Sequence, residues 1–385
     1  MVGPNYIKRI NQARILNLLR VQGKMSRAEI ARQLTLTRST VSLLTADLMK
    51  SGVIIDCKHF SSVQTTGRPS VGMQLNPKGG YFIGVEIGVE RIRVIALNLM
   101  VEILSKISTP LKTKDPAAVE DQVVALIRKV QGNTLRGHPR LLGVGITVPG
   151  MLNRRNIVEY ASMLGWRNVD LRPNIEEKLG IPVCIENDAN AAALAEFYFG
   201  GTNVDENLFY LLLDVGVGGG MIIDGKIYTG SFGTAGEIGH LRLPLSLDFD
   251  GEFQTKSFED CVGKGALLKL YKQSGGHRED FFELYKQLEM GDAAALRAVS
   301  QWGKMLSMGI LTIIDIVNPS HIVLGGPLAK LFPFAQKSFS LLLPMDPFPG
   351  ARSVQFIQSR FNEDACVMGA AAIVYESLFR VDQPN

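Results

Sequence analysis

Residues 186–196 read ENDANAAALAE, and they decide how the chain folds. A short apolar run at residues 181–185 precedes them, and the alanine-rich half favours a helix because alanine has the highest helix propensity. We therefore expect a strand to end and a helix to begin at Asn187 and Asp188. Ligands bind beyond the carboxyl ends of the strands in an open α/β sheet. A carboxylate at this place can also cap the helix, so Asp188 is either a cap or a ligand-binding group.

Two similar arrangements of strand, acidic residue, glycine turn and strand lie on either side of this stretch. The first covers residues 81–99 and the second covers residues 208–223. Their layout predicts two related α/β lobes. Four glycines follow the acidic residue of the second arrangement, namely Gly216, Gly218, Gly219 and Gly220. Such glycines let backbone N–H groups come close to an anion, as in phosphate-binding loops, and the alternative is a glycine-rich hairpin without a ligand.

Three further segments complete the predicted body. Residues 233–240 read GTAGEIGH, which predicts a close-packed turn that presents the polar side chains of Glu237 and His240. Trp166 is assigned to the hydrophobic core rather than to a ligand contact, because large aromatic side chains are usually buried. The alanine-rich segment that starts at Gly369 predicts a closing helix.

Composition limits the class of protein. A chain of 385 residues with 46% hydrophobic and 20% charged residues is expected to be a soluble globular protein of two or three domains. Its longest apolar stretch, residues 305–317, is too short to span a bilayer, and the N-terminus lacks the hydrophobic region of a signal peptide. Four scattered cysteines fit reduced thiols and a cytoplasmic location: Cys57, Cys184, Cys261 and Cys366.

Positive charge is concentrated at the N-terminus. Residues 1–80 contain twelve basic and three acidic side chains, a balance of +9, whereas the whole chain carries +4. The remainder is therefore acidic, at −5. This asymmetry predicts a polyanionic partner for the N-terminal segment alone.

The same segment has the pattern of a winged helix-turn-helix. A helical apolar pattern ends at Gly23, Ser26 and Glu29 form a capping box for a second helix, and a third helix starts near Arg38. The apolar residues of the third helix are Val41, Leu43, Leu44 and Leu48. Residues 53–75 then predict a two-stranded wing.

Short hydroxyl side chains and arginines suit contact with base edges and phosphates in the major groove. The candidate DNA-binding residues are Arg27, Arg38, Ser39, Thr40, Ser42 and, at the tip of the wing, Arg68. The alternative for this segment is a small helical domain whose charges are only solvated.

Four segments in this order make the chain resemble the ROK family of repressors, open reading frames and sugar kinases: ENDANAAALAE, DVGVGGG (214–220), GEIGH (236–240) and VNPSHIVLGG (317–326). It is most similar to the sugar-responsive repressors of that family. The resemblance implies an α/β chain with a winged helix-turn-helix at residues 1–80 and a two-lobed, actin- or hexokinase-like (ribonuclease H-like) body. The first lobe would comprise residues 81–188 and 366–385, and the second, with a dimerisation surface, residues 189–365.

The resemblance also implies roles for particular residues. A sugar in the cleft between the lobes would be held by Asn187, Asp188, Glu237, His240 and Glu259. In the kinases of the family, the residue at the place of Asp188 takes the proton from the attacking hydroxyl, and the glycines at 216–220 would face the nucleotide phosphates.

The sequence departs from the family pattern at two places. Kinases have an aspartate at position 86 and a small hydroxyl residue at position 90, where this chain has Glu86 and Glu90, and extra carboxylates beside polyphosphate cost electrostatic energy. The three cysteines of the family's structural zinc site fall on Asp250, Glu252 and Ser257. Because structural zinc prefers thiolate and imidazole ligands, we expect no zinc at this site. We also expect no other cofactor and no catalytic residue.

The resulting expectation is a cytoplasmic, homodimeric (or dimer-of-dimers) repressor that binds operator DNA and is controlled by a sugar or sugar phosphate. Ligand would close the lobes and change the spacing of paired DNA-binding heads. Two alternatives stay open: an ATP-dependent sugar kinase with an added DNA-binding domain, and a protein-binding scaffold that has lost its ligand.

Overall fold

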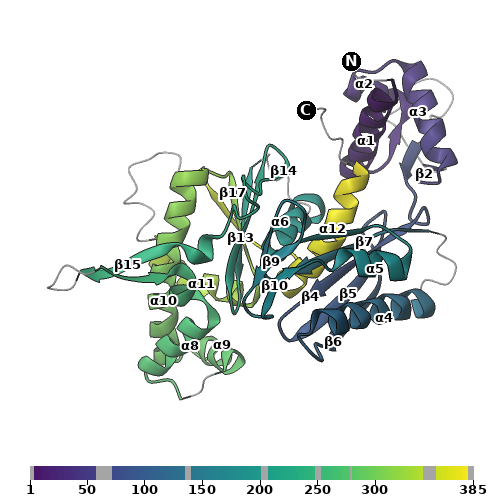
Figure 1. The fold of residues 1–385 in the computed structure, drawn as a ribbon. Helices are drawn as coiled ribbons and strands as arrows, with labels where there is room; N and C mark the ends of the chain where they lie inside the picture. The colour runs from purple at the N-terminus through teal and green to yellow at the C-terminus, as the bar shows by residue number, and fades with distance from the viewer. Residues whose placement is uncertain are drawn as a thin grey trace. The chain divides into compact units, whose positions relative to one another are not determined.

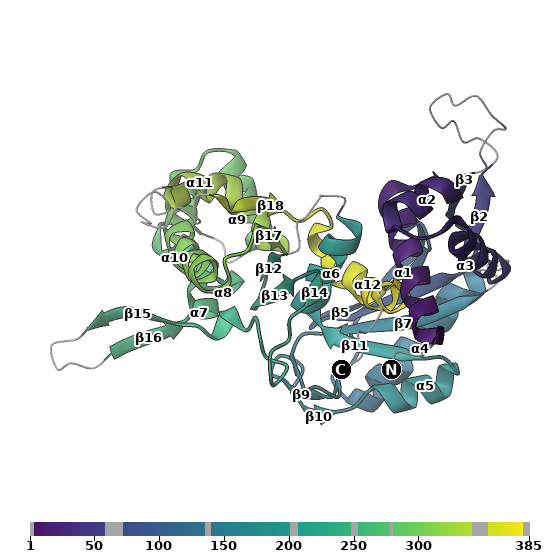
Figure 2. The same cartoon turned by 90° about the horizontal axis from the view of Figure 1, so that it is seen from above.

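The computed structural model describes residues 4–57, 72–134, 140–200, 207–247, 253–277, 280–340 and 353–379. The chain forms two compact units (Figure 1 and Figure 2). The first unit contains residues 1–148, 162–186 and 370–385, and the second contains residues 149–161 and 187–369. The three domain limits expected from the sequence remain a prediction.

The N-terminal segment folds as three helices and a small sheet. The helices are α1 (Pro4–Gln22), α2 (Arg27–Leu34) and α3 (Arg38–Lys50), and the sheet has the order β1 (Met25–Ser26), β3 (Gly72–Leu75), β2 (Ile54–Cys57). The predicted capping box is confirmed, because Ser26 Oγ accepts the N–H of Glu29 and the Glu29 carboxylate accepts the N–H of Ser26. Helices α1, α2 and α3 and strands β2 and β3 lie where the sequence predicts them, so the predicted helices and wing strands are confirmed. The predicted wing-tip residue Arg68 lies outside the described residues.

Helix α3 corrects one assignment made from the sequence. Val41, Leu44 and Leu48 are buried, as their spacing predicts. The apolar pattern groups Leu43 with these residues, but its side chain is 65% exposed. Leu43 lies on the same face of α3 as Ser39, four residues earlier, and both are exposed. This face is not the one that packs in the core of the head.

The first unit contains a five-stranded sheet in the order β11 (Val183–Asn187), β7 (Leu141–Val148), β4 (Tyr81–Ile87), β5 (Arg91–Asn98), β6 (Ile103–Pro110). Strand β4 pairs antiparallel with β5 and parallel with β7. Helices α4 (Pro116–Thr134) and α5 (Arg172–Leu179) pack against each other, and α4 contacts β5 and β6.

Helix α12 (Ala365–Phe379) begins four residues before the predicted start at Gly369. The middle of this helix packs directly on β7, because a Cβ atom at Gly145 would lie 1.8 Å from the carbonyl oxygen of Ala370. Trp166 opens β10 (Trp166–Val169), is 2% exposed and donates its indole N–H to the Lys114 carbonyl at 2.6 Å. The assignment of Trp166 to the core is confirmed.

The second unit contains a sheet in the order β14 (Lys226–Ile227), β13 (Val217–Ile223), β12 (Leu208–Leu213), β17 (His321–Gly325), β18 (Gln355–Gln358). In both sheets the first strand in sequence is central, the second and third follow on one side, and the fourth and fifth lie on the other. In this sheet β12 pairs antiparallel with β13 and parallel with β17, as β4 does with β5 and β7. The two related α/β arrangements predicted from the sequence are thus confirmed.

The remaining elements of the second unit are mainly helical. They are α6 (Asp188–Phe199), α7 (Phe258–Val262), α8 (Lys264–Gln273), α9 (Phe281–Glu289), α10 (Ala293–Val317) and α11 (Phe332–Ser340), the hairpins β8 (Met151–Leu152) with β9 (Val158–Ala161) and β15 (Arg242–Leu247) with β16 (Phe253–Ser257), and the 3₁₀ turns η1 (Ile238–His240), η2 (Pro327–Leu331) and η5 (Asn362–Asp364).

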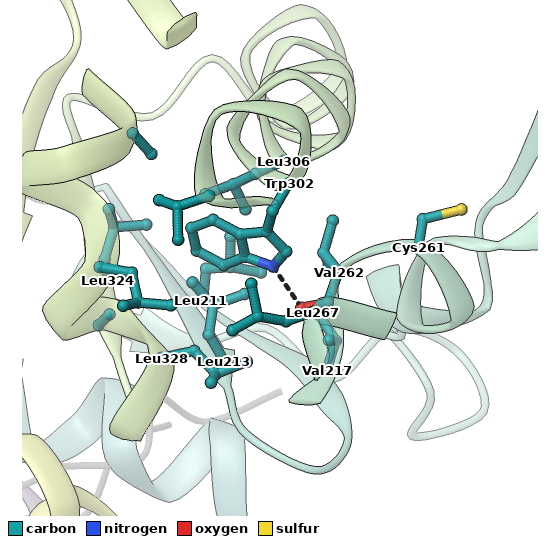
Figure 3. Close-up of a cluster of buried hydrophobic side chains, with 14 of the residues drawn as sticks. Leu211, Leu213, Val217, Cys261, Val262, Leu267, Trp302, Leu306, Leu324 and Leu328 are labelled. Carbon is teal, nitrogen blue, oxygen red and sulfur yellow. Dashed lines mark hydrogen bonds between the residues drawn. The ribbon is translucent and has the colours of Figure 1, made fainter. Parts of the chain in front are cut away.

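The hydrophobic core of the second unit is built around Trp302 of α10. Figure 3 shows its indole ring among side chains of the sheet and of η2, including Leu211, Leu324 and Leu328. The indole N–H donates to the carbonyl oxygen of Val262 at 2.7 Å, so the buried polar atom of the ring is satisfied. This core holds one face of the sheet in place.

Helix α6 covers the opposite face of the same sheet. Gly218 and Gly220 lie within strand β13, not in a turn as the glycine pattern suggested, and both are opposite α6. A Cβ atom at Gly220 would lie 2.4 Å from the carbonyl oxygen of Ala189 and 2.9 Å from the Cβ of Ala193. The glycines therefore allow the helix backbone to rest directly on the strand.

We predict that Gly220→Ala lowers the free energy of unfolding by about 1–3 kcal/mol, because backbone atoms meet the added methyl group. A urea titration followed by circular dichroism measures the change. Gly265→Ala is the matched control, since it adds the same methyl to helix α8 where nothing lies within 4 Å. It should leave stability unchanged or raise it by up to about 1 kcal/mol. Equal midpoints for both variants would contradict the packing account.

Candidate functional site

Asn187 connects the end of β11 to the start of α6 and is the N-cap of that helix. Its Oδ1 accepts the N–H of Asn190 at 3.0 Å, and its Nδ2 donates to the carbonyl oxygen of Gly150 at 3.0 Å. Asp188 is the first residue of α6, so the capping role considered for Asp188 belongs to Asn187.

Asp188 is part-buried at the start of α6, and its Oδ1 accepts the N–H of Ala189 at 2.8 Å. Burial raises the pKa of the Asp188 carboxyl from 3.8 to about 7. The N–H of Ala189 lowers this pKa, whereas the nearby carboxylates of Glu237 and Asp214 raise it. Near neutral pH the carboxyl group is therefore divided between its protonated and ionised forms.

Glu237 and His240 are presented by the turn around η1. The Glu237 side chain is 29% exposed and that of His240 is 67% exposed, with His240 Nε2 3.9 Å from Glu237 Oε2. Burial raises the pKa of Glu237, His240 lowers it and Glu259 raises it. The turn packs tightly on β13, as predicted, because a Cβ atom at Gly239 would lie 2.1 Å from the Val217 carbonyl oxygen.

Glu259 lies in α7, and its Oε2 accepts the N–H of Val217 at 2.9 Å. Val217 opens β13 between Gly216 and Gly218, so a carboxylate of the protein accepts a backbone N–H next to the glycines predicted to approach an anion. The turn is closed further by a hydrogen bond from the Asp214 N–H to the Gly216 carbonyl at 3.0 Å.

The structure thus brings the predicted sugar-binding residues into one neighbourhood of the second unit, linked by the contacts and electrostatic effects given above. Asp214 is an additional member that the sequence prediction did not include among the site residues, although its position before the glycine turn was a signal. We call this set the carboxylate cluster: Asn187, Asp188, Asp214, Glu237, His240 and Glu259. Several carboxylate oxygens and an imidazole in one place can accept hydrogen bonds from the hydroxyl groups of a polyol.

The two glutamates of the first glycine turn have different surroundings. Glu86 is buried on β4 and pairs with Arg93, the residue opposite it on β5, with Oε1 2.8 Å from Nη2. Glu90 is exposed in the turn between the same strands, which is closed by a hydrogen bond from the Gly88 N–H to the Arg91 carbonyl at 2.9 Å. The charge of Glu86 is thereby balanced within the sheet.

The N-terminal end of α3 presents most of the predicted DNA-binding residues. Thr37 is the N-cap and accepts the N–H of Thr40 at 3.1 Å. The hydroxyl groups of Ser39 and Thr40 contact Thr37 Oγ1 at 2.9 and 2.8 Å. Arg38 and Ser42 are exposed on the same helix.

Arg27 takes part in contacts inside the head. Its Nε donates to Thr45 Oγ1 at 3.2 Å, Nη2 contacts the sulfur of Met49 at 3.3 Å, and the same nitrogen is 3.7 Å from Asp56 Oδ1. Arg27 therefore fastens the start of α2 to α3 and β2, and its contact with DNA stays a prediction.

A winged helix-turn-helix joined to a duplicated ribonuclease H-like body with a carboxylate cluster defines a class of DNA-binding protein with a small-molecule site. The ROK family model matches residues 82–377, and the model of a winged helix-turn-helix DNA-binding domain matches residues 9–55. The chain belongs to the ROK family.

Similar proteins include both regulators and kinases. The xylose repressor of Bacillus spizizenii is 28% identical over 376 residues, which cover 96% of each chain. A ROK family transcriptional regulator described as a homologue of the E. coli MLC protein superposes with a TM-score of 0.83 at 24% identity over 97% of each chain. A ROK family glucokinase from Streptomyces griseus, solved with glucose and AMPPNP, has a TM-score of 0.64 at 25% identity and covers 77% of this chain and 100% of its own.

Two further observations concern the membrane and metal predictions. In the described ranges, no helix has the length and apolar character needed to cross a membrane. Ser257, one of the three places of the family's zinc cysteines, is the N-cap of α7 and accepts the N–H of Asp260 at 3.1 Å, while Asp250 and Glu252 lie outside the described residues. The absence of zinc stays a prediction.

Asp188→Asn should stabilise the protein increasingly as pH rises from about 4 to about 8. Well below pH 4, Asp188 is protonated in both the folded and the unfolded state. Between about pH 4 and pH 7 the unfolded state loses this proton while the folded state retains it, so the free energy of unfolding of the natural chain falls as pH rises through this window. Asparagine cannot ionise and avoids this loss, by about 2 kcal/mol at pH 8 after allowance for solvent screening.

Thermal unfolding at several pH values measures this difference. A pH-independent difference between Asp188→Asn and the natural chain would contradict the raised pKa of Asp188.

Proposed function

We propose that this chain is a cytoplasmic, sugar-responsive transcriptional repressor. The winged helix-turn-helix binds operator DNA, and a sugar or sugar phosphate bound at the carboxylate cluster changes that affinity. The observation that carries the proposal is the full-length match to the xylose repressor of Bacillus spizizenii, which includes the DNA-binding segment as well as the body. The glucokinase of Streptomyces griseus covers only 77% of the chain.

The polar groups of the carboxylate cluster support a sugar as effector. Carboxylates form charge-assisted hydrogen bonds with hydroxyl groups, and such bonds to charged groups contribute about 1.5–3 kcal/mol each. Asp188, Glu237 and the free oxygen positions of Glu259 supply acceptors, while His240 can donate or accept. The names of the similar repressors make xylose the first sugar to test.

Phosphoryl transfer is the alternative activity, with Asp188 as the general base. Three features favour a regulator without phosphoryl transfer. Glu86 stands where the kinases have aspartate, and its carboxylate is already paired with Arg93. Glu90 places an exposed carboxylate in the first glycine turn, and in the second turn the N–H of Val217 already donates to the carboxylate of Glu259. The negative charge of Glu90 and Glu259 opposes the binding of a nucleotide polyphosphate.

We also propose that the chain contains no structural zinc and acts as a homodimer or a pair of dimers. The places of the zinc cysteines hold Asp250, Glu252 and Ser257, which are poor substitutes for thiolates. Operators read by helix-turn-helix proteins are commonly palindromic, which matches a two-fold dimer. Metal analysis and light scattering of the purified protein address these two points.

Calorimetric titration with xylose and a panel of related sugars should show saturable binding to the natural chain. Glu237→Gln should weaken that binding about tenfold or more, because a neutral amide replaces a charged acceptor. Glu289→Gln, at an exposed position of α9, should bind as the natural chain does. The same sugars with ATP in a coupled assay should give no phosphorylation above background.

Two outcomes would overturn the proposal in different ways. ATP-dependent phosphorylation that disappears in Asp188→Asn would establish the kinase. No heat and no thermal shift with any sugar of the panel would instead favour a scaffold that has lost its ligand.

Arg38→Ala should weaken binding to an operator duplex selected by the natural chain and should flatten the dependence of affinity on salt. Each phosphate contact that a cation makes adds about one to the slope of log affinity against log salt. Fluorescence anisotropy over a range of salt concentrations measures both effects. Arg128→Ala removes the same charge from α4 of the body and should change neither. Equal behaviour of the two variants would contradict the assignment of α3 to DNA recognition.

A further inference from the structure

The exposed face of helix α3 contains one large apolar side chain. Leu43 is 65% exposed, and its exposed neighbours on the helix are small or polar: Arg38, Ser39, Ser42 and Ala46. The opposite face carries the apolar residues that hold the helix in the head, so Leu43 contributes little to the fold. Within the described part of the head, the other exposed large apolar residues are Ile7 and Val21, and both belong to α1.

The surroundings of Leu43 are suited to a close approach by DNA. Ser39, Ser42 and Ala46 have short side chains, so a base edge can come near the helix backbone beside Leu43. Asp47, one turn after Leu43, would repel phosphates, but its carboxylate is 2.5 Å from the ammonium group of Lys8 on α1. This pairing reduces the negative charge beside the exposed face.

The chemistry of the major groove offers one apolar partner for such a side chain. The 5-methyl group of thymine is the apolar feature by which a protein distinguishes thymine from the other bases there, and apolar side chains contact it. A leucine on a recognition helix that also carries Arg38 is placed to make this contact while the arginine contacts phosphate or a purine edge. The net charge of +9 on residues 1–80 favours DNA over a protein surface as the occupant.

We propose that Leu43 packs against the 5-methyl group of a thymine in the operator and thereby helps to specify the DNA sequence. The proposal rests on the DNA-binding function proposed above. Leu43 is then a specificity-determining residue of the head, in addition to the polar residues predicted from the sequence.

The test uses the full-length protein and duplexes selected by it from a random-sequence pool. Each thymine of the selected site is replaced in turn by deoxyuridine, in both half-sites, which removes only the methyl group and keeps base pairing. At one thymine per half-site the natural chain should lose about fourfold in affinity for each half-site, the effect of one buried methyl group. Leu43→Ala should bind the thymine duplex more weakly and should no longer distinguish thymine from deoxyuridine at that position.

Ile7→Ala is the matched control, because it truncates an equally large side chain that is 51% exposed on α1. It should keep the full response to deoxyuridine. A Leu43→Ala variant with the same thymine-to-deoxyuridine ratio as the natural chain, or a natural chain insensitive to every replacement, would overturn the proposal while leaving DNA binding intact. Failure to enrich any duplex would instead overturn the DNA-binding function, and this proposal with it.

Discussion

Helix α6 can lie directly on strand β13 because the strand has no side chains where the helix crosses it. Gly218 and Gly220 face Ala189 and Ala193. A Cβ atom at Gly218 would lie 3.1 Å from the Cβ of Ala189, and one at Gly220 would meet the backbone carbonyl of Ala189. Asn187 then ties the start of the helix to Gly150 through one side-chain hydrogen bond and to Asn190 through another. These constraints hold the first turn of α6, and with it the position of the Asp188 carboxylate, on a rigid support.

The position of Asp188 explains the electrostatic character of the site. A part-buried carboxyl with Glu237 and Asp214 nearby is costly to ionise, which is the cause of its raised pKa. One oxygen of the neighbouring Glu259 carboxylate accepts the N–H of Val217. A polyol that donates hydrogen bonds to these oxygens, as the proposed sugar would, offsets the cost of crowding negative charge, whereas an anionic polyphosphate would add to that cost.

Local sequence patterns were sufficient for much of the fold. The Ser26–Glu29 capping box, the alanine-rich helix after Asp188 and the two strand–turn–strand arrangements each depend on residues close together in sequence, and all are present. The apolar pattern was less reliable for single positions, because Leu43 differs from Leu44 only by one step around the helix, yet one is exposed and the other buried.

Features that depend on distant partners could not be predicted. The role of Gly220 is set by α6, which no local pattern connects to the glycine-rich strand. Arg27 contacts Thr45 and Met49, and Glu86 is balanced by Arg93, so the meaning of each charged residue depends on the tertiary structure. The candidate sugar-binding residues were named through the family resemblance, whereas Asp214 required the structure.

The central claim is that sugar binding at the carboxylate cluster and DNA binding at the head are coupled. Coupling between two sites is reciprocal, so any factor by which the sugar changes the affinity for the operator must equal the factor by which the operator changes the affinity for the sugar. The most direct measurement is the sugar dissociation constant with and without saturating operator DNA. If the sugar relieves repression, the account predicts that saturating operator DNA raises the sugar dissociation constant, by the same factor by which the sugar raises the operator dissociation constant. An identical sugar affinity in the presence and absence of operator would contradict it.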